Sequence, residues 1–240
     1  MDEQSNKPSH TRHLRALAGS GIVRLLLLAA TVLVVRACLP QQTALANNAP
    51  TQLPRKLIIV PTDGLPALFM SSLRTRLEAQ HKFGVTATVA IPFPAYAQIG
   101  DSGQYSAAEI ADAGWHTCRR LADADEYCVV LTSRDINEKD SGVRYFFAQH
   151  YDGVSVVSTA RMNPLNFGER IDLLSTPLVF DQIQARVAKM INKGLGLSYY
   201  GYALSNDKAS VMYAPIMGLD DLDAVGEGYT GRETRHKNFP

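Results

Sequence analysis

The sequence is poor in the side chains that metal and redox chemistry require. No cysteine follows Cys128 in this chain of 240 residues. Beyond the N-terminal segment the histidines are scattered, at His81, His116, His150 and His236. None of them lies four residues from another, the spacing that presents two metal ligands on one face of a helix, so we interpret each as a surface or structural histidine. A Ser-His-Asp signature, a phosphate loop and a dinucleotide fingerprint are also missing.

An excess of charge of one sign is missing as well. Lys and Arg together number 24 and Asp and Glu 23, which leaves a formal net charge of +1. A nucleic-acid partner normally requires a concentrated basic face, and this balance gives no electrostatic reason to expect one. With 46% hydrophobic and 20% charged residues, the composition is typical of a near-neutral globular domain.

The N-terminus does contain one long apolar run, Leu25–Val35, flanked by Arg24 and Arg36. It is shorter than the roughly 20 residues of a membrane-spanning helix and fits the roughly 7–15 of a signal-peptide core. A cleavage site of the A-x-A type follows at Ala44–Ala46. The segment length favours export, periplasmic or secreted, over an uncleaved anchor in which Ile22–Leu39 spans the membrane. In both interpretations the domain lies outside the cytoplasm, and only in the second is the membrane a lasting partner.

We therefore divide the chain into a signal peptide or membrane anchor (1–46), a polar linker (47–55) and a folded domain (56–240). Of the three cysteines, Cys38 falls in the targeting segment, where Arg36 fits badly with a lipid-attachment motif. Cys118 and Cys128 remain in the domain. In an exported domain an even pair of cysteines can form a disulfide, and two buried free thiols are the alternative.

Apolar periodicity in the domain predicts strands that alternate with helices, followed by a hairpin and a long helix. In the first helix, Leu68, Met70, Leu73 and Leu77 form the apolar stripe. This order of elements implies an α/β domain with a mixed sheet. The predicted strands are Lys56–Pro61, Val85–Ile91, Tyr127–Thr132, Tyr145–Ala148 and Val154–Ser158, and the predicted helices are Pro66–Gln80, Ser106–Leu121, Val179–Lys193 and Leu219–Val225.

The residue spacing in the long helix resembles that of a metzincin zinc site, but the zinc ligands are missing. In H-E-x-x-H-x-x-G-x-x-H, two His one turn apart and a third beyond a Gly bind zinc, and the Glu is the general base. The three ligand positions here read Lys189, Lys193 and Tyr199, and the base position reads Met190. A protonated Lys has no lone pair to give a metal, and Met cannot shuttle protons. We therefore expect no catalytic residue and no resident metal or other cofactor at these positions.

Two other parts of the frame are intact. Gly196 stands where the chain of a metzincin turns toward its third ligand, and Met212 lies in a Ser-Val-Met-Tyr segment that resembles the Met-turn. For Lys189 and Lys193, two interpretations stay open. They form a solvated helix face, which is the norm for lysines, or they are a pair of cations that bind an anion at the base of a cleft.

From Lys56 to Tyr229 the chain resembles the archaemetzincins, a metzincin-type family of predicted zinc proteases. The similarity extends to Leu57–Pro61, Gln104–Ser106, Tyr145–Gln149 and Val156–Pro164. It implies a metzincin-like single domain with a twisted mixed sheet, a hairpin edge, a long active-site helix and a Met-turn. The second, structural zinc of the family would require C-terminal cysteines, which this chain lacks.

The resemblance implies shape rather than protease activity, and our first hypothesis is a non-catalytic pseudo-protease. Metzincins hold a substrate along an edge strand, so a peptide or protein segment would dock by β-addition on Tyr145, Phe146, Phe147, Ala148 and Gln149. Two alternatives remain: an active zinc-dependent metallopeptidase, a hydrolase with an unrecognised metal site, and a structural envelope-associated domain without a ligand. Zinc is a cofactor only in the first alternative.

Overall fold

A computed structural model describes residues 55–62, 65–122, 126–163 and 177–235. The predicted targeting segment, nearly all of the predicted linker and His236 lie outside these residues. Within the described ranges, no helix is both long and apolar enough to cross a membrane.

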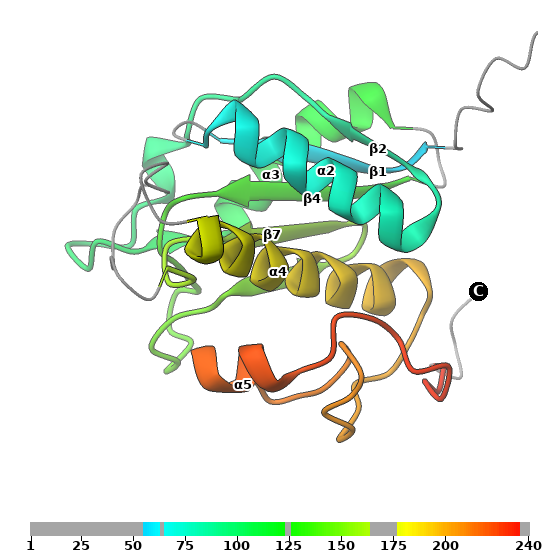
Figure 1. Ribbon diagram of the computed structural model, residues 1–240. Helices are drawn as coiled ribbons and strands as arrows, with labels where there is room; N and C mark the ends of the chain where they lie inside the picture. Colours follow the sequence, from blue (N-terminus) through cyan, green and yellow to red (C-terminus); the bar gives the residue numbers. More distant parts are fainter. Residues whose placement is uncertain (1–54, 63–64, 123–125, 164–176, 236–240) are drawn as a thin grey trace, which may run out of the picture. The chain divides into compact units, whose positions relative to one another are not determined.

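A five-stranded mixed sheet forms the centre of the domain (Figure 1). Its strands are β1 (Arg55–Pro61), β2 (Gly84–Ala87), β4 (Tyr127–Thr132), β6 (Ala148–Tyr151) and β7 (Val154–Ser158). Their order is β2-β1-β4-β7-β6, and only β6, at one edge, is antiparallel to its neighbour. All six residues of β4 are buried, because helices cover both faces of the sheet, and such a strand is a continuous apolar run.

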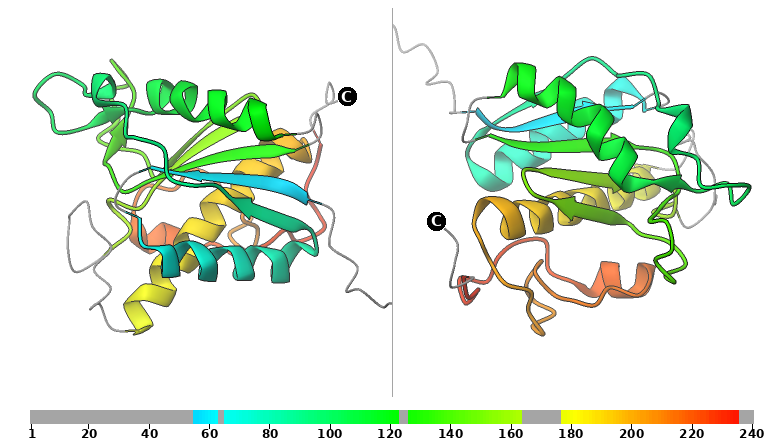
Figure 2. Two further views of the ribbon diagram at one scale, coloured as in Figure 1. Left: turned by 90° about the horizontal axis from the view of Figure 1, so that it is seen from above. Right: turned by 180° about the vertical axis from the view of Figure 1, so that it is seen from behind.

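Helices on the two faces of the sheet create two separate cores (Figure 2). The helices are α2 (Ala67–His81), α3 (Ala107–Leu121), α4 (Pro177–Gly194) and the short α5 (Leu219–Ala224). Leu57 and Ile59 of β1 point into the core beneath α2 and α4, and Ile58 and Val60 point into the core beneath α3. This alternation is the period-two pattern of a strand. The predicted α/β fold with a mixed sheet, a hairpin edge and a long helix is confirmed.

Smaller elements connect the main ones. The fragments β3 (Tyr105–Ser106) and β5 (Ile136–Asn137) pair in parallel as a second sheet, and a 3-10 turn, η1, covers Ala95–Ala97. Beyond α4 the chain continues as a π-helical turn, η2 (Leu195–Tyr199).

Three local predictions differ from the structure. Leu68 is 61% exposed, and Phe69, which is fully buried, takes its place in the core. The second strand ends at Ala87 instead of Ile91. The edge strand begins at Ala148 instead of Tyr145, because the backbone N–H of Phe146 donates to Ile136 O (3.0 Å) of β5. Contacts between distant segments decide these boundaries, and local periodicity does not record them.

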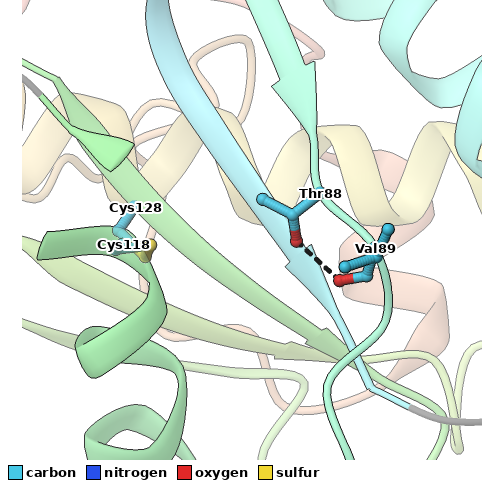
Figure 3. The surroundings of a disulfide bond; sticks show 4 residues. All are labelled: Thr88, Val89, Cys118 and Cys128. Carbon is cyan, nitrogen blue, oxygen red and sulfur yellow. Dashed lines mark hydrogen bonds between the residues drawn. A yellow bond between two sulfur atoms is a disulfide. The ribbon is translucent and has the colours of Figure 1, made fainter. Parts of the chain in front are cut away.

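A disulfide joins Cys118, near the end of α3, to Cys128 on β4 (Figure 3). Their Cα atoms are 6.1 Å apart, within the usual range for a bridge. One helical turn earlier, Gly114 lets α3 approach the sheet closely, because a Cβ there would lie 2.1 Å from Val130 Cγ2. Helix and strand are therefore close enough for the two sulfur atoms to bond.

Candidate functional site

The two lysines at the metzincin ligand positions are buried, and they extend toward the C-terminal part of the domain. Lys189 is 6% exposed and Lys193 is 8% exposed. Lys189 Nζ donates to Leu222 O (2.9 Å) and Asp223 O (3.1 Å). Lys193 Nζ donates to Tyr213 O (2.5 Å). The interpretation of these residues as a solvated helix face is therefore wrong, because the chain that follows α4 returns and covers this face.

The carbonyl groups that Lys189 binds belong to the last turn of α5. The final carbonyls of a helix have no partner within the helix and carry its partial negative charge, so an ammonium group there caps α5. Beside it, Arg186 donates to both carboxylate oxygens of Asp223 (2.7 and 2.5 Å). The hydrogen bonds from Arg186 hold the pKa of Asp223 below its usual value. Two cations of α4 thus anchor α5 to the main body of the domain.

Burial also changes the acid–base properties of the two lysines. Loss of hydration lowers the pKa of Lys189, although nearby Asp223 and Glu227 oppose this effect. It lowers the pKa of Lys193 to about 8, and burial is the cause. Lys193 is therefore still mostly protonated at neutral pH, but it loses its charge at a lower pH than an exposed lysine.

Met212 lies directly against the helix at Gly196. A Cβ added to Gly196 would be 2.3 Å from Met212 Sδ, and Met212 is fully buried. Gly196 does not turn the chain, as predicted from the metzincin frame, because it lies within η2 and the helix continues to Tyr199. The left-handed backbone that ends this segment is at Gly201 (φ 67°). Gly196 is needed instead for its close approach to Met212.

Tyr199, at the third ligand position, belongs to an aromatic cluster. Its ring centroid is 5.0 Å from that of Tyr200 in an edge-on arrangement. Tyr200 also stacks with Tyr202 at 5.5 Å and meets Tyr229 edge-on at 5.5 Å. These rings pack against one another in the space after η2. Because η2 is helical, Tyr199 does not come from a turn directed back toward Lys189 and Lys193.

Sequence reasoning missed a polar cluster next to α4. His150 Nδ1 and Ser155 Oγ are hydrogen-bonded at 2.5 Å, and Tyr127 Oη is hydrogen-bonded to the same hydroxyl. Burial, together with the positive charge of Lys193, lowers the pKa of His150 to about 4. A Cβ on Gly194 would lie 2.5 Å from Ser155 Oγ, so the helix packs tightly on this cluster. Its sequence signal was the hairpin, which makes His150 and Ser155 cross-strand partners.

A cavity of about 520 Å³ lies between the edge strand and the segment after Met212. Four of the five predicted docking residues line it, and Gln149 does not. Met190 and Lys193 contribute from α4. The full lining consists of Gly142, Val143, Arg144, Tyr145, Phe146, Phe147, Ala148, His150, Met190, Lys193, Pro215, Ile216 and Met217.

The mixed sheet with an antiparallel edge, the long helix and the buried methionine beneath it define a metzincin-like α/β fold. Comparison with solved structures specifies it further: the chain has an archaemetzincin-like fold. The predicted resemblance is thereby confirmed at the level of the fold. No protein-family model and no curated protein matches the sequence.

Solved structures of two archaemetzincins and of a zinc-dependent peptidase resemble this one. The archaemetzincin of Methanopyrus kandleri shares 22% identity at a TM-score of 0.58, over 77% of this chain and 93% of that chain. The archaemetzincin of Archaeoglobus fulgidus, complexed with malonate, shares 16% identity at a TM-score of 0.55, over 72% of this chain and 94% of that chain. A zinc-dependent peptidase of Methanocorpusculum labreanum shares 18% identity at a TM-score of 0.59, over 73% of this chain and 96% of that chain. Sequence identities this low support a shared fold but do not establish a shared activity.

The residues at the ligand positions of this chain do not fit a zinc ion. Lys189 and Lys193 direct buried ammonium donors to backbone carbonyls, and a metal would require lone pairs there. Across the described parts of the chain, no three His, Cys, Asp or Glu side chains gather closely enough to hold a metal ion. The fold is that of the archaemetzincins, and the donor set is different.

Proposed function

We propose that this domain is a non-catalytic pseudo-protease that binds a peptide or protein segment. The observation that supports the first part is the orientation of the two lysines. Each uses its ammonium group to hold the C-terminal segment in place, so these side chains have a structural task that a metal ligand could not share. Met190 at the base position is 3% exposed and has no group that accepts a proton at neutral pH.

The outer edge of β6 supports the second part of the proposal. Ser158 N donates to Phe147 O (2.9 Å), so Phe147 forms a hydrogen-bonded pair with β7. Such pairs alternate along an antiparallel ladder, which directs the N–H and C=O groups of Ala148 and His150 to the outside. Both residues line the cavity. A peptide added to this edge would find backbone partners and an adjacent space for its side chains.

We also propose that the N-terminal segment places the domain outside the cytoplasm. The apolar run Leu25–Val35 supports this, and so does the disulfide between Cys118 and Cys128, since disulfides persist in oxidising compartments. N-terminal sequencing of the native protein tests it: a cleaved product begins near Asn47, whereas an anchored one retains Arg36. A full-length protein that is soluble in the cytosol would contradict both.

Metal analysis and peptide binding test the pseudo-protease proposal on the purified protein. We expect less than about a tenth of an equivalent of zinc, because a true site retains its metal tightly. Labelled random hexapeptides should bind, as measured by fluorescence anisotropy, and mass spectrometry should find them intact. One equivalent of zinc, with a peptidase activity that a chelator removes, would establish the active metallopeptidase instead.

A further inference from the structure

We propose that the cavity beside β6 recognises the C-terminal carboxylate of its peptide, with Lys193 as the buried cation that binds it. This inference rests on the peptide-binding function proposed above and specifies the class of peptide. It combines three observations: the charges that line the cavity, the polarity of the open edge and the point at which that edge is closed.

The charged side chains that line the cavity are cationic. Lys193, which is buried, contributes to the lining, and Arg144 is exposed. None of the described residues that line it is Asp or Glu. His150 is neutral at pH 7, because burial and the nearby lysine lower its pKa to about 4. The remaining lining is mostly apolar, including Phe147 and Ile216. An anionic group with an apolar attachment therefore complements this space.

The ammonium group of Lys193 is well placed to receive a carboxylate. It has three N–H donors, and one is directed to Tyr213 O. Burial without a counter-charge destabilises the protonated form, which is why the pKa of Lys193 falls to about 8. A carboxylate that enters the cavity would supply that counter-charge. Charge-assisted hydrogen bonds of this kind are among the stronger ones in proteins.

The geometry of the edge indicates which end of a peptide enters. A peptide that pairs antiparallel to β6 starts near Tyr151 and runs toward Ala148. The next outward-facing position, Phe146, is already bonded to Ile136 O of β5 (3.0 Å). The ladder therefore cannot extend further in this direction. An antiparallel peptide must leave the edge or end here, and the end that arrives is its C-terminus. This favours a terminal carboxylate over the side chain of an internal Asp or Glu.

Three labelled peptide pools test the inference on the unaltered protein. All are random heptapeptides with rhodamine at the N-terminus: one has a free C-terminal carboxylate, one is amidated, and both lack Asp and Glu. The third is amidated and contains a single Asp at varied positions. By anisotropy at pH 7, the free-carboxylate pool should bind at least about tenfold more tightly than either amidated pool. This preference should weaken as the pH rises from about 7 to 9.5, because Lys193 loses its charge there.

Substitutions then identify the cation. Lys193→Met should abolish the preference for the free carboxylate, and Lys193→Arg should retain most of it. The matched control Lys82→Met, at an exposed position at the end of α2, should leave it unchanged. The pool comparison and its pH profile need no variant, so a misfolded Lys193→Met protein would not remove the test.

Each contrary outcome has its own meaning. Equal binding of the free and the plain amidated pools would overturn the carboxylate inference and leave the peptide-binding function standing. Equal binding of the free and the Asp-containing amidated pools would show that a side-chain carboxylate is recognised instead. If no pool binds, the peptide-binding function itself is refuted.

Discussion

Lys189, on α4, stabilises the molecule because it caps the C-terminal end of α5. Its ammonium group reaches the carbonyls of Leu222 and Asp223 in the last turn of α5. That helix has six residues (Leu219–Ala224), too few to be stable alone, so its place depends on such contacts. The lost hydration of the ammonium group opposes them and lowers the pKa of Lys189.

Replacing this lysine measures the balance of the two effects. We expect Lys189→Met to lower the free energy of unfolding by about 1–3 kcal/mol, the usual cost of leaving buried polar groups without a partner. Urea unfolding of the purified protein measures it. Lys82→Met, at an exposed site, should change the free energy by less than about 0.5 kcal/mol. Equal effects of the two substitutions would mean that solvent satisfies these carbonyls.

The sequence predicted which residues occupy the site but not what their side chains do. The ligand spacing located Lys189, Lys193 and Met212 because it is fixed by the helix and by the motif. The burial of the lysines was not predictable, since exposure is normal for lysine and the covering segment is some 20 to 35 residues further on. The same holds for the cluster around His150, because its hydrogen-bond partner Ser155 also bonds to Tyr127 on another strand.

At the scale of elements, the most constrained contact is the one between η2 and the turn that holds Met212. The Met212 side chain occupies the space where a Cβ of residue 196 would be, 2.3 Å from Sδ. Two residues earlier and on the other side of the helix, Gly194 instead faces Ser155, His150 and Tyr127. The two glycines therefore have different neighbours, because positions two residues apart lie on different faces of a helix.

A double-mutant cycle tests this assignment. Gly196→Ala should destabilise the protein by about 1–3 kcal/mol through overpacking, and Met212→Ala by about 2–5 kcal/mol through loss of a buried side chain. The double variant should be more stable than the sum predicts by at least about 1 kcal/mol, because the new Cβ occupies part of the vacated space. Urea unfolding gives all four values.

Gly194→Ala combined with Met212→Ala is the matched control. These two substitutions should be additive within about 0.5 kcal/mol, since the added Cβ meets the polar cluster and not the methionine. Equal coupling in both cycles would show that Gly196 and Met212 do not share space and would remove the contact on which the Met-turn interpretation rests.

Element types were predictable to a greater extent than element ends. β4 is a continuous apolar run, α4 is long and periodic, and the hairpin has a turn at Asp152–Gly153, so their positions follow from local sequence. The start of β6 depends on a bond between Phe146 and Ile136, which no local pattern contains. That bond is also what closes the edge in the proposed peptide site.

At the scale of the whole molecule, an archaemetzincin-like fold is present, while Lys189, Met190, Lys193 and Tyr199 stand at the ligand and base positions of the metzincin motif. The sheet, α4 and the chain after Met212 enclose a cavity of about 520 Å³, which is within the usual range for ligand sites. The shape depends on backbone packing and tolerates the exchange of His for Lys, whereas zinc chemistry does not. Peptide binding, which we propose for this domain, depends on that shape and requires no zinc.

The disulfide relates this architecture to the compartment of the protein. Cys118 and Cys128 are separated by 10 residues, and closing a loop of that length should stabilise the domain by roughly 2–3 kcal/mol. Reduction should lower the urea midpoint accordingly.

In cells, acid-trapped thiols can be counted by the mass added by a maleimide under denaturing conditions. A cleaved and exported domain should take up no label before reduction and two labels after it, because Cys38 lies in the removed segment. An anchored protein should take up one and then three, since its Cys38 is retained. Three labels on the full-length protein without reduction would mean that the domain resides in a reducing compartment, which would refute the proposed location and leave the fold unaffected.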